Sequence, residues 1–215
     1  SKAESISNLV DEITPFIANG VDRQTGKITL KIDGAPEIEL SAVIDGITED
    51  GLVLFRPAKL RPIDRIELNI KHLFLQVFSN FEDSAYFFAT DENLELNPVR
   101  DPVAELEKML SFYWQGLSNS LPFFPKASAI YSKGLAEGKD EIKAQERAID
   151  SWRGSTLFQG EAQDSYNWVI YKGSFPQDDA FAETALSVLS PRLFGLDEEA
   201  GLGLETVNGG ESETA

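Results

Sequence analysis

Hydrophobic and polar residues near the start of the chain follow first a helical and then a strand period. The helical period over residues 5–18 predicts a short amphipathic helix, which Pro15 is expected to bend or shorten. Three strand-like segments come next, separated by turns that contain glycine: Lys27–Ile32 and Glu37–Ile47, which alternate, and Leu52–Arg56, a compact apolar run that Pro57 stops. Because short turns join antiparallel neighbours, these segments predict a three-stranded meander.

The most regular helical pattern lies over Pro62–Phe81, where the apolar positions fall on one face. They are Ile66, Ile70, Leu73, Phe74, Val77, Phe78 and Phe81. A strand rich in aromatic residues is predicted over Ser84–Thr90, and Leu94–Leu96 is expected to pair back with it. The predicted order of elements in this half of the chain is therefore α-β-β-β-α-β.

The second half of the chain is predicted to be mainly helical. Asp101 is expected to cap a helix that has Pro102 at its first position and ends at Gly116. Further helices are predicted over Ala127–Leu135, Asp140–Trp152 and Ala180–Phe194. Large aromatic side chains usually contribute burial energy, so Trp152 and Trp168 are both expected in the core. No repeat or interior linker is visible, which predicts one α/β domain over residues 1–195.

Composition narrows the class of protein. The 215 residues include no cysteine, which excludes disulfide scaffolds and thiolate metal sites and fits the reducing cytoplasm. No apolar run approaches the length of a membrane span, so no membrane partner is expected. The formal net charge is −17, and residues 196–215 hold six acids, no base and several glycines, as expected of a flexible acidic tail. Such acidity disfavours binding of nucleic acid by the isolated chain and favours protein partners.

The order α-β-β-β-α-β is that of the core of PD-(D/E)xK nucleases. Those enzymes place an acid on the second strand and an acid-x-lysine pair on the third, so that carboxylates hold a divalent cation. Asp45 is the candidate on the second strand, but the third reads Leu54-Phe55-Arg56 and no shift of register restores an acid. A single carboxylate holds Mg²⁺ poorly. The sequence thus predicts a degenerate nuclease-like fold in which Asp45 is a vestige, with no catalytic residue, bound metal or cofactor.

Several short motifs resemble, in order, the C-terminal domain of the exodeoxyribonuclease V gamma subunit family, RecC. The resemblance covers roughly residues 25–196. Its motifs are Glu49-Asp50-Gly51-Leu52-Val53-Leu54-Phe55-Arg56-Pro57, Leu121-Pro122-Phe123-Phe124-Pro125-Lys126, Trp152-Arg153-Gly154, Phe158-Gln159-Gly160-Glu161 with Asp164-Ser165-Tyr166, and Ala185-Leu186-Ser187-Val188-Leu189-Ser190-Pro191-Arg192-Leu193-Phe194.

The resemblance implies a non-catalytic domain of a bacterial helicase-nuclease that processes double-strand breaks for recombinational repair. In that family the gamma subunit is similar to a helicase without ATPase function. It splits duplex DNA, threads single strands and helps to recognise the recombination hotspot. The implied partners are the alpha and beta subunits, which supply ATP hydrolysis and cutting, and DNA reached through the complex.

Two groups of residues are candidates for contacts. Arg56, Lys59, Arg61 and Arg65 lie within ten residues that contain only one acid, Asp64, and they are the expected phosphate contacts. The alternative is a solvated loop and helix start that forms salt bridges with nearby acids. Phe123 and Phe124 lie between two prolines and are the expected docking aromatics for a partner subunit. Two alternatives stay open for this pair, a stacking platform for bases and packing against the domain itself. The single histidine, His72, is expected to be a structural residue, either on a helix surface or with its hydrogen bonds satisfied.

Two other functions stay open from the sequence alone. One is an active metal-dependent nuclease in which Glu12 or Glu37 joins Asp45. The other is a protein-interaction scaffold that makes no contact with DNA. Convergence of carboxylates near Asp45 would favour the first, and absence of a continuous basic groove would favour the second.

Overall fold

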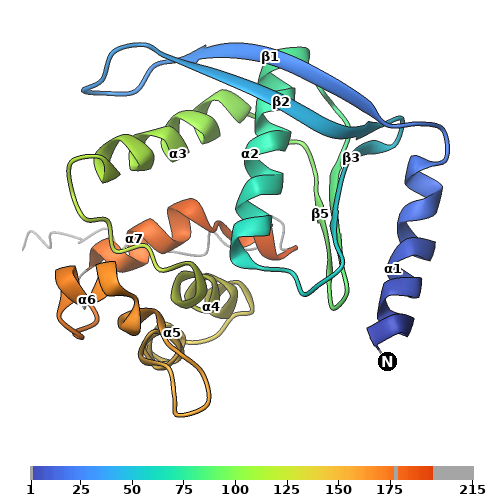
Figure 1. Cartoon of the computed structure of the whole chain (residues 1–215). Coiled ribbons are helices and arrows are strands. Elements are labelled where there is room, and N and C mark those ends of the chain that lie inside the picture. The colour runs from blue at the N-terminus through green and yellow to red at the C-terminus, as the bar shows by residue number, and fades with distance from the viewer. Residues whose placement is uncertain (1, 177–178, 196–215) are drawn as a thin grey trace, which may run out of the picture.

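The computed structural model describes residues 2–176 and 179–195, and its N-terminal part is a mixed sheet flanked by helices (Figure 1). We call residues 2–101 the sheet region. Its elements are α1 (Lys2–Ile17), β1 (Asp22–Leu30), β2 (Ile38–Thr48), β3 (Gly51–Arg56), α2 (Pro62–Ser79), β4 (Ala85–Ala89) and β5 (Asn93–Leu96). The predicted order of elements is therefore confirmed.

The five strands lie in the order in which they occur along the chain. β1, β2 and β3 form an antiparallel meander, as predicted, with Arg23 opposite Asp45. α2 then carries the chain across the sheet, so β4 pairs parallel with β3, and β5 returns antiparallel to β4. β1 begins at Asp22, earlier than its apolar alternation predicted, because strand pairing depends on backbone hydrogen bonds as well as on side-chain pattern.

Helices cover both faces of the sheet (Figure 1). α1 packs through Leu9 and Ile13 on Val53 and Phe88, whereas α2 packs on the opposite face in the main core. α1 continues through Pro15 to Ile17, so the expected shortening does not occur. Pro15 lies in the last turn of α1, where loss of one backbone donor costs less than in the middle of a helix.

α2 is the central helix of the molecule, and ten of its 18 residues are buried. Pro62 starts it, and the Asp64 carboxylate accepts a hydrogen bond from the Arg61 backbone N–H at 2.9 Å. It ends at Asn80, whose left-handed backbone (φ 52°) lets its N–H donate to the Leu75 carbonyl.

The rest of the described chain is helical. Its elements are α3 (Pro102–Gly116), α4 (Pro125–Ala136), α5 (Glu141–Arg153), η1 (Glu161–Gln163), α6 (Ser165–Tyr171), α7 (Asp179–Val188) and η2 (Pro191–Phe194), the η elements being short 3-10 helices. Asp101 caps α3 as predicted, by accepting from the Ala104 N–H at 3.0 Å. α3 lies beneath the long β1–β2 hairpin (Figure 1), where Glu107 Oε1 accepts from the Lys31 N–H at 3.1 Å.

α4, α5, η1, α6 and α7 form what we call the helical region, which has an aromatic core of its own. Phe124, Trp152, Phe175 and Phe181 pack together there with ring centroids 4.7 to 6.2 Å apart. The chain leaves α5 through Gly154, whose φ is +75° and whose missing Cβ would lie 2.3 Å from the backbone nitrogen of Gly160. Only glycine fits this crossing, which explains the glycines of two of the sequence motifs.

One predicted helix of this half needs correction, and two short elements were missed. The helix predicted over 180–194 is broken after Val188, because Ser190 is extended and Pro191 cannot continue a helical hydrogen-bond ladder. η1 and α6 were not predicted. The acidic tail expected over 196–215 lies outside the described residues. Within the part that the structure does describe, no helix has the length and apolar character needed to cross a membrane.

Candidate functional site

Asp45, the vestigial catalytic candidate, lies on the solvent side of β2. Its carboxylate forms an ion pair with Arg23 on the neighbouring strand at 2.8 Å, and both side chains are 66% exposed. On the neighbouring strand β3, the described residues Gly51–Arg56 include no acid, as the sequence indicates. An exposed acid that is paired across two strands is a surface ion pair of small energetic value.

The two carboxylates that were considered as partners for Asp45 are engaged elsewhere. Glu12 on α1 accepts a hydrogen bond from Asn93 Nδ2 at 2.7 Å. Glu37 pairs with Lys31 at 2.8 Å near the tip of the β1–β2 hairpin, and this hydrogen bond and the lysine charge lower the pKa of Glu37. Among the residues described, no three acidic or histidine side chains are grouped closely enough to hold a metal ion.

The segment from Arg56 to Arg65, which we call the basic segment, is organised around one buried acid. Asp64 is 4% exposed at its side chain and accepts from Arg56 Nη1 at 3.2 Å and from Arg61 Nη2 at 2.7 Å. The structure therefore brings Arg56 and Arg61 together, as the spacing suggested. Asp64 also neutralises part of their charge, which the count of basic residues alone did not anticipate.

Arg65 lies inside the molecule and not on the surface of the basic segment. It is 5% exposed, donates from Nη1 to the Leu193 carbonyl at 2.6 Å and forms an ion pair with Glu92. Its guanidinium carbon also lies 4.9 Å from the ring centroid of Phe194. Arg65 thus joins α2 to the β4–β5 turn and to η2, and it is not accessible to a phosphate in this conformation.

Lys59 and Arg61 are the most accessible cations of the basic segment. Lys59 is exposed, and the Arg61 side chain is 55% exposed. The loop that carries them is held in place, because the Ala58 carbonyl accepts from the Thr90 N–H at 3.1 Å and Asp91 accepts from the Leu60 N–H at 2.8 Å. A small, ordered cationic surface therefore lies between β3 and α2.

The aromatic pair is divided between two environments. Phe124 is 1% exposed and belongs to the core of the helical region, so the expectation that it is exposed is wrong. Phe123 is half-buried and lines an apolar pocket of about 390 Å³ between α2, α3 and α7. Phe124 has an extended backbone (φ −117°, ψ 106°) just before α4, and consecutive side chains of an extended segment point to opposite sides.

His72 is a structural residue, as expected. It is fully buried on α2, and its Nε2 lies 2.9 Å from the Asp83 carbonyl. Burial is the main cause that lowers the pKa of His72 to about 4. It is therefore neutral at pH 7, with Nε2–H as the donor to Asp83.

Sequence reasoning missed an exposed apolar surface on α6. Trp152 is fully buried as expected, but Trp168 on α6 is 60% exposed, so the prediction that it lies in the core is wrong. Tyr166, Val169 and Ile170 of the same helix are 80%, 73% and 48% exposed. The signal was present in the Asp164 cap followed by a short apolar run, but such a run is typical of a buried strand or helix.

Comparison with known proteins bears on all of these surfaces. The family model described as RecC C-terminal domain matches residues 2–136, more than half of the chain. The chain belongs to the RecC C-terminal domain family. The matched residues of this family member include β2 with Asp45, the basic segment and the Phe123–Phe124 pair. The resemblance drawn from the sequence motifs is confirmed.

A curated relative places this family member within a longer protein. The RecBCD enzyme subunit RecC of Escherichia coli (strain K12) is 20% identical over 203 residues, which cover 89% of this chain. The same alignment covers 18% of that subunit, so the chain spans less than one fifth of its length.

Proposed function

We propose that this chain is a non-catalytic domain of a RecC-type subunit, in a helicase-nuclease that processes double-strand breaks for recombinational repair. The observation that carries the absence of catalysis is the dispersal of the acids. Asp45, Glu12 and Glu37 each bind a different partner on a different part of the surface. Hard divalent cations require several oxygen ligands at one point, and this arrangement does not supply them.

A degenerate nuclease-like core is part of the same proposal. It is supported by the order α-β-β-β-α-β and by the α2 crossover that sets β4 parallel to β3. In such a core the second and third strands carry the catalytic residues. Here Asp45 keeps an acid on the second strand, while Leu54 and Phe55 make the third strand apolar. The fold would then serve to present surfaces and not to perform chemistry.

The surfaces suit two kinds of contact. Arg56, Lys59 and Arg61 would guide a DNA strand that reaches the domain through the complex, as accessible cations on an ordered loop. Arg65 is left out of this role because it is buried. Other subunits of the enzyme, corresponding to the alpha and beta chains, would dock on the acidic protein. We also propose that the protein is located in the cytoplasm.

A cleavage assay with matched strand variants tests the proposal. Single-stranded and duplex DNA are incubated with the wild-type chain, Asp45→Ala and Glu39→Ala in Mg²⁺ or Mn²⁺. Glu39 is the matched control because it is an exposed acid on β2 that pairs across to Lys27 at 2.8 Å, as Asp45 pairs to Arg23. We expect no cleavage by any of the three. Wild-type cleavage that persists in Glu39→Ala and disappears in Asp45→Ala would establish an active nuclease instead.

A further inference from the structure

α6 is a helix whose apolar side chains point away from the protein. We call Tyr166, Trp168, Val169 and Ile170 the α6 surface. Their exposed fractions lie between 48% and 80%, and no residue of α6 is buried. Tyr166, Val169 and Ile170 are spaced i, i+3 and i+4, so they share one helical face. In an ordinary surface helix, this would be the face turned toward the core.

The exposure does not come from loose attachment of α6. The Asp164 side chain caps the helix by accepting from the Tyr166 and Asn167 N–H groups at 2.9 and 3.3 Å. Asn167 Nδ2 donates to the Glu161 carbonyl at 2.9 Å. At the other end, the Tyr171 ring lies 5.2 Å from the ring of Phe124 in the aromatic core. Both ends are therefore anchored, and the apolar face is held outward.

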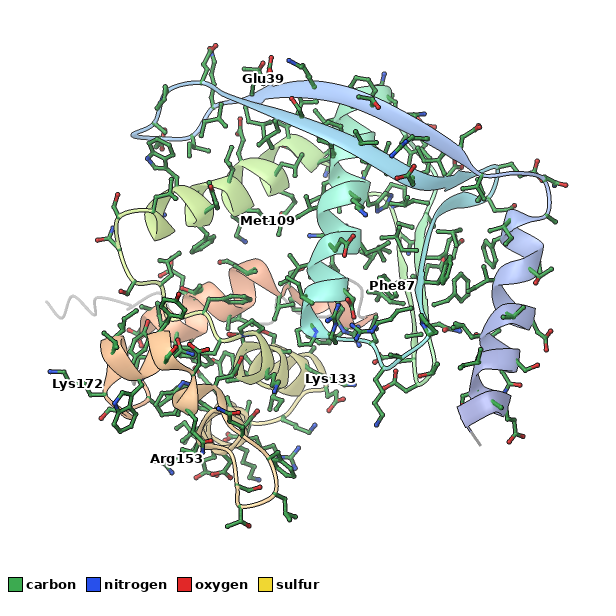
Figure 2. All side chains as sticks on the ribbon, viewed as in Figure 1. Glu39, Phe87, Met109, Lys133, Arg153 and Lys172 are labelled. Atoms are coloured by element: carbon green, nitrogen blue, oxygen red, sulfur yellow. The ribbon has the colours of Figure 1, made fainter. Side chains whose placement is uncertain are left out.

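The surroundings of the α6 surface are less acidic than the chain as a whole. From the start of α4 to the end of α7, residues 125–188 contain ten acidic and seven basic side chains, so this part of the chain is mildly acidic, whereas the full chain has a net charge of −17. Figure 2 shows Lys172, at the end of α6, directed outward at the edge of the molecule. A patch of Trp, Tyr and branched aliphatic side chains with few charges has the composition of the centre of a protein interface.

Charge decides between the possible occupants of this surface. A second copy of the chain would bring another −17 and be repelled at low salt, and a nucleic acid would be repelled in the same way. Tyr166 and Trp168 can stack on bases, but Val169 and Ile170 cannot, and α6 contains no basic side chain to hold a phosphate. A protein with a positive field and an apolar recess satisfies both the field of the whole chain and the chemistry of the patch.

We propose that the α6 surface docks a basic partner protein, with Tyr166 and Val169 as anchors in an apolar recess of that partner and Trp168 at the edge of the contact. Under the function proposed above, on which this inference rests, the partner is another subunit of the same helicase-nuclease. The docking surface that the sequence assigned to Phe123 and Phe124 thus lies on α6. The acidic field of the chain accelerates the encounter, and the apolar contact holds the complex.

The test measures capture of the two other subunits by the wild-type chain, by Tyr166→Ser/Val169→Ser and by Ile142→Ser. Ile142 is the matched control because it is 67% exposed on α5 in the same region and does not belong to the α6 surface. We expect the double variant to lose at least about tenfold in affinity, because central aromatic anchors dominate interface energies. We expect Ile142→Ser to stay within about twofold of wild type, as rim contacts do.

Quenching of tryptophan fluorescence by iodide gives a second measure that does not depend on affinity alone. The chain has three tryptophans, and Trp168 is the only one of them that is strongly exposed. The difference in quenching between wild type and Trp168→Phe therefore reports on Trp168. We expect the captured partner to abolish most of this difference.

Each outcome either supports or overturns the docking proposal. Loss of capture in the double variant alone, with protection of Trp168, supports it. Equal capture by wild type and double variant overturns it, and so does capture of neither subunit by wild type. Self-association or DNA binding that the double variant abolishes would replace the partner with a second copy or a nucleic acid. The non-catalytic function is judged separately, by the cleavage assay.

Discussion

α2 and α6 contain comparable apolar sequences but use them in opposite ways. α2 buries ten of its 18 residues between the sheet and α3, and its polar residues Asp64 and His72 are buried with it. α6 buries none of its seven residues, although five of them are aromatic or branched aliphatic. The difference shows that apolar content indicates what a segment can contact, while the surrounding chain decides whether that contact lies inside the molecule.

The largest expected effect is on the free energy of unfolding, when each of the two tryptophans of the helical region is replaced by alanine. Trp152 is fully buried and packs on Phe124 and Phe175. We expect Trp152→Ala to lower the free energy of unfolding by about 3–5 kcal/mol, through lost burial and a residual cavity. Trp168→Ala should change it by less than about 1 kcal/mol, because most of that side chain is already in water.

Urea unfolding followed by far-ultraviolet circular dichroism measures both tryptophan variants without depending on the fluorescence that they remove. Nearly equal losses of stability would contradict the comparison, because they would mean that Trp168 contributes to a core. A large loss of stability in Trp152→Ala alone would support the contrast between the buried core and the exposed α6 surface.

The sequence predicted the sheet region well because its elements are long and their periods are regular. The meander, α2 and the β4–β5 pair follow from alternation, caps and turns that lie within each segment. α6 and the break at Ser190 were missed, since a seven-residue helix with five apolar residues has no resolvable period and a helix break depends on one Pro-linked peptide. A hydrophobic period predicts a helix or strand only where the segment is long enough for the period to repeat.

The sequence predicted which residues of the candidate site lie close together, but not which of them reach solvent. The clustering of Arg56 and Arg61 could be read from their spacing, and the structure brings them together. The burial of Arg65 could not, because it depends on η2, which is 128 residues away along the chain. The separation of Phe123 from Phe124 likewise depends on how α4 turns against α5 and α7. Long-range packing sets which charged or aromatic groups reach solvent.

An effect of intermediate size is expected on the pH dependence of the free energy of unfolding, which should depend on His72 of α2 and not on α6. The pKa of His72 falls from 6.5 to about 4 on folding, so the unfolded chain binds the extra proton more readily. The stabilisation is complete above about pH 6.5 and is lost as the pH falls toward 4. Between pH 7.5 and pH 5, we expect His72 to cost the folded state about 2 kcal/mol.

Denaturant unfolding at the two pH values, on wild type and His72→Leu, isolates this contribution from that of the carboxylates. The variant should lose less stability than wild type on acidification, by about the amount given above. Tyr166→Ser should show the wild-type pH dependence, because α6 contains no titrating partner of His72. An equal pH dependence in wild type and His72→Leu would show that His72 is not the responsible group.

The smallest expected effect concerns the partial neutralisation of the basic segment by Asp64. Asp64→Asn keeps an acceptor for the Arg61 N–H but removes the charge that holds Arg56 and Arg61. We expect the weak affinity for single-stranded DNA to increase several-fold in Asp64→Asn. Arg61→Ala should lower the affinity and should also reduce the slope of log affinity against log salt by about 0.7.

The matched control is Lys172→Ala, which removes an exposed cation next to the α6 surface and should leave the slope unchanged. Fluorescence anisotropy at four salt concentrations measures each slope. A slope that falls in Lys172→Ala but not in Arg61→Ala would place the DNA contact beside α6, and α6 would then be a nucleic-acid surface and the sheet region a scaffold.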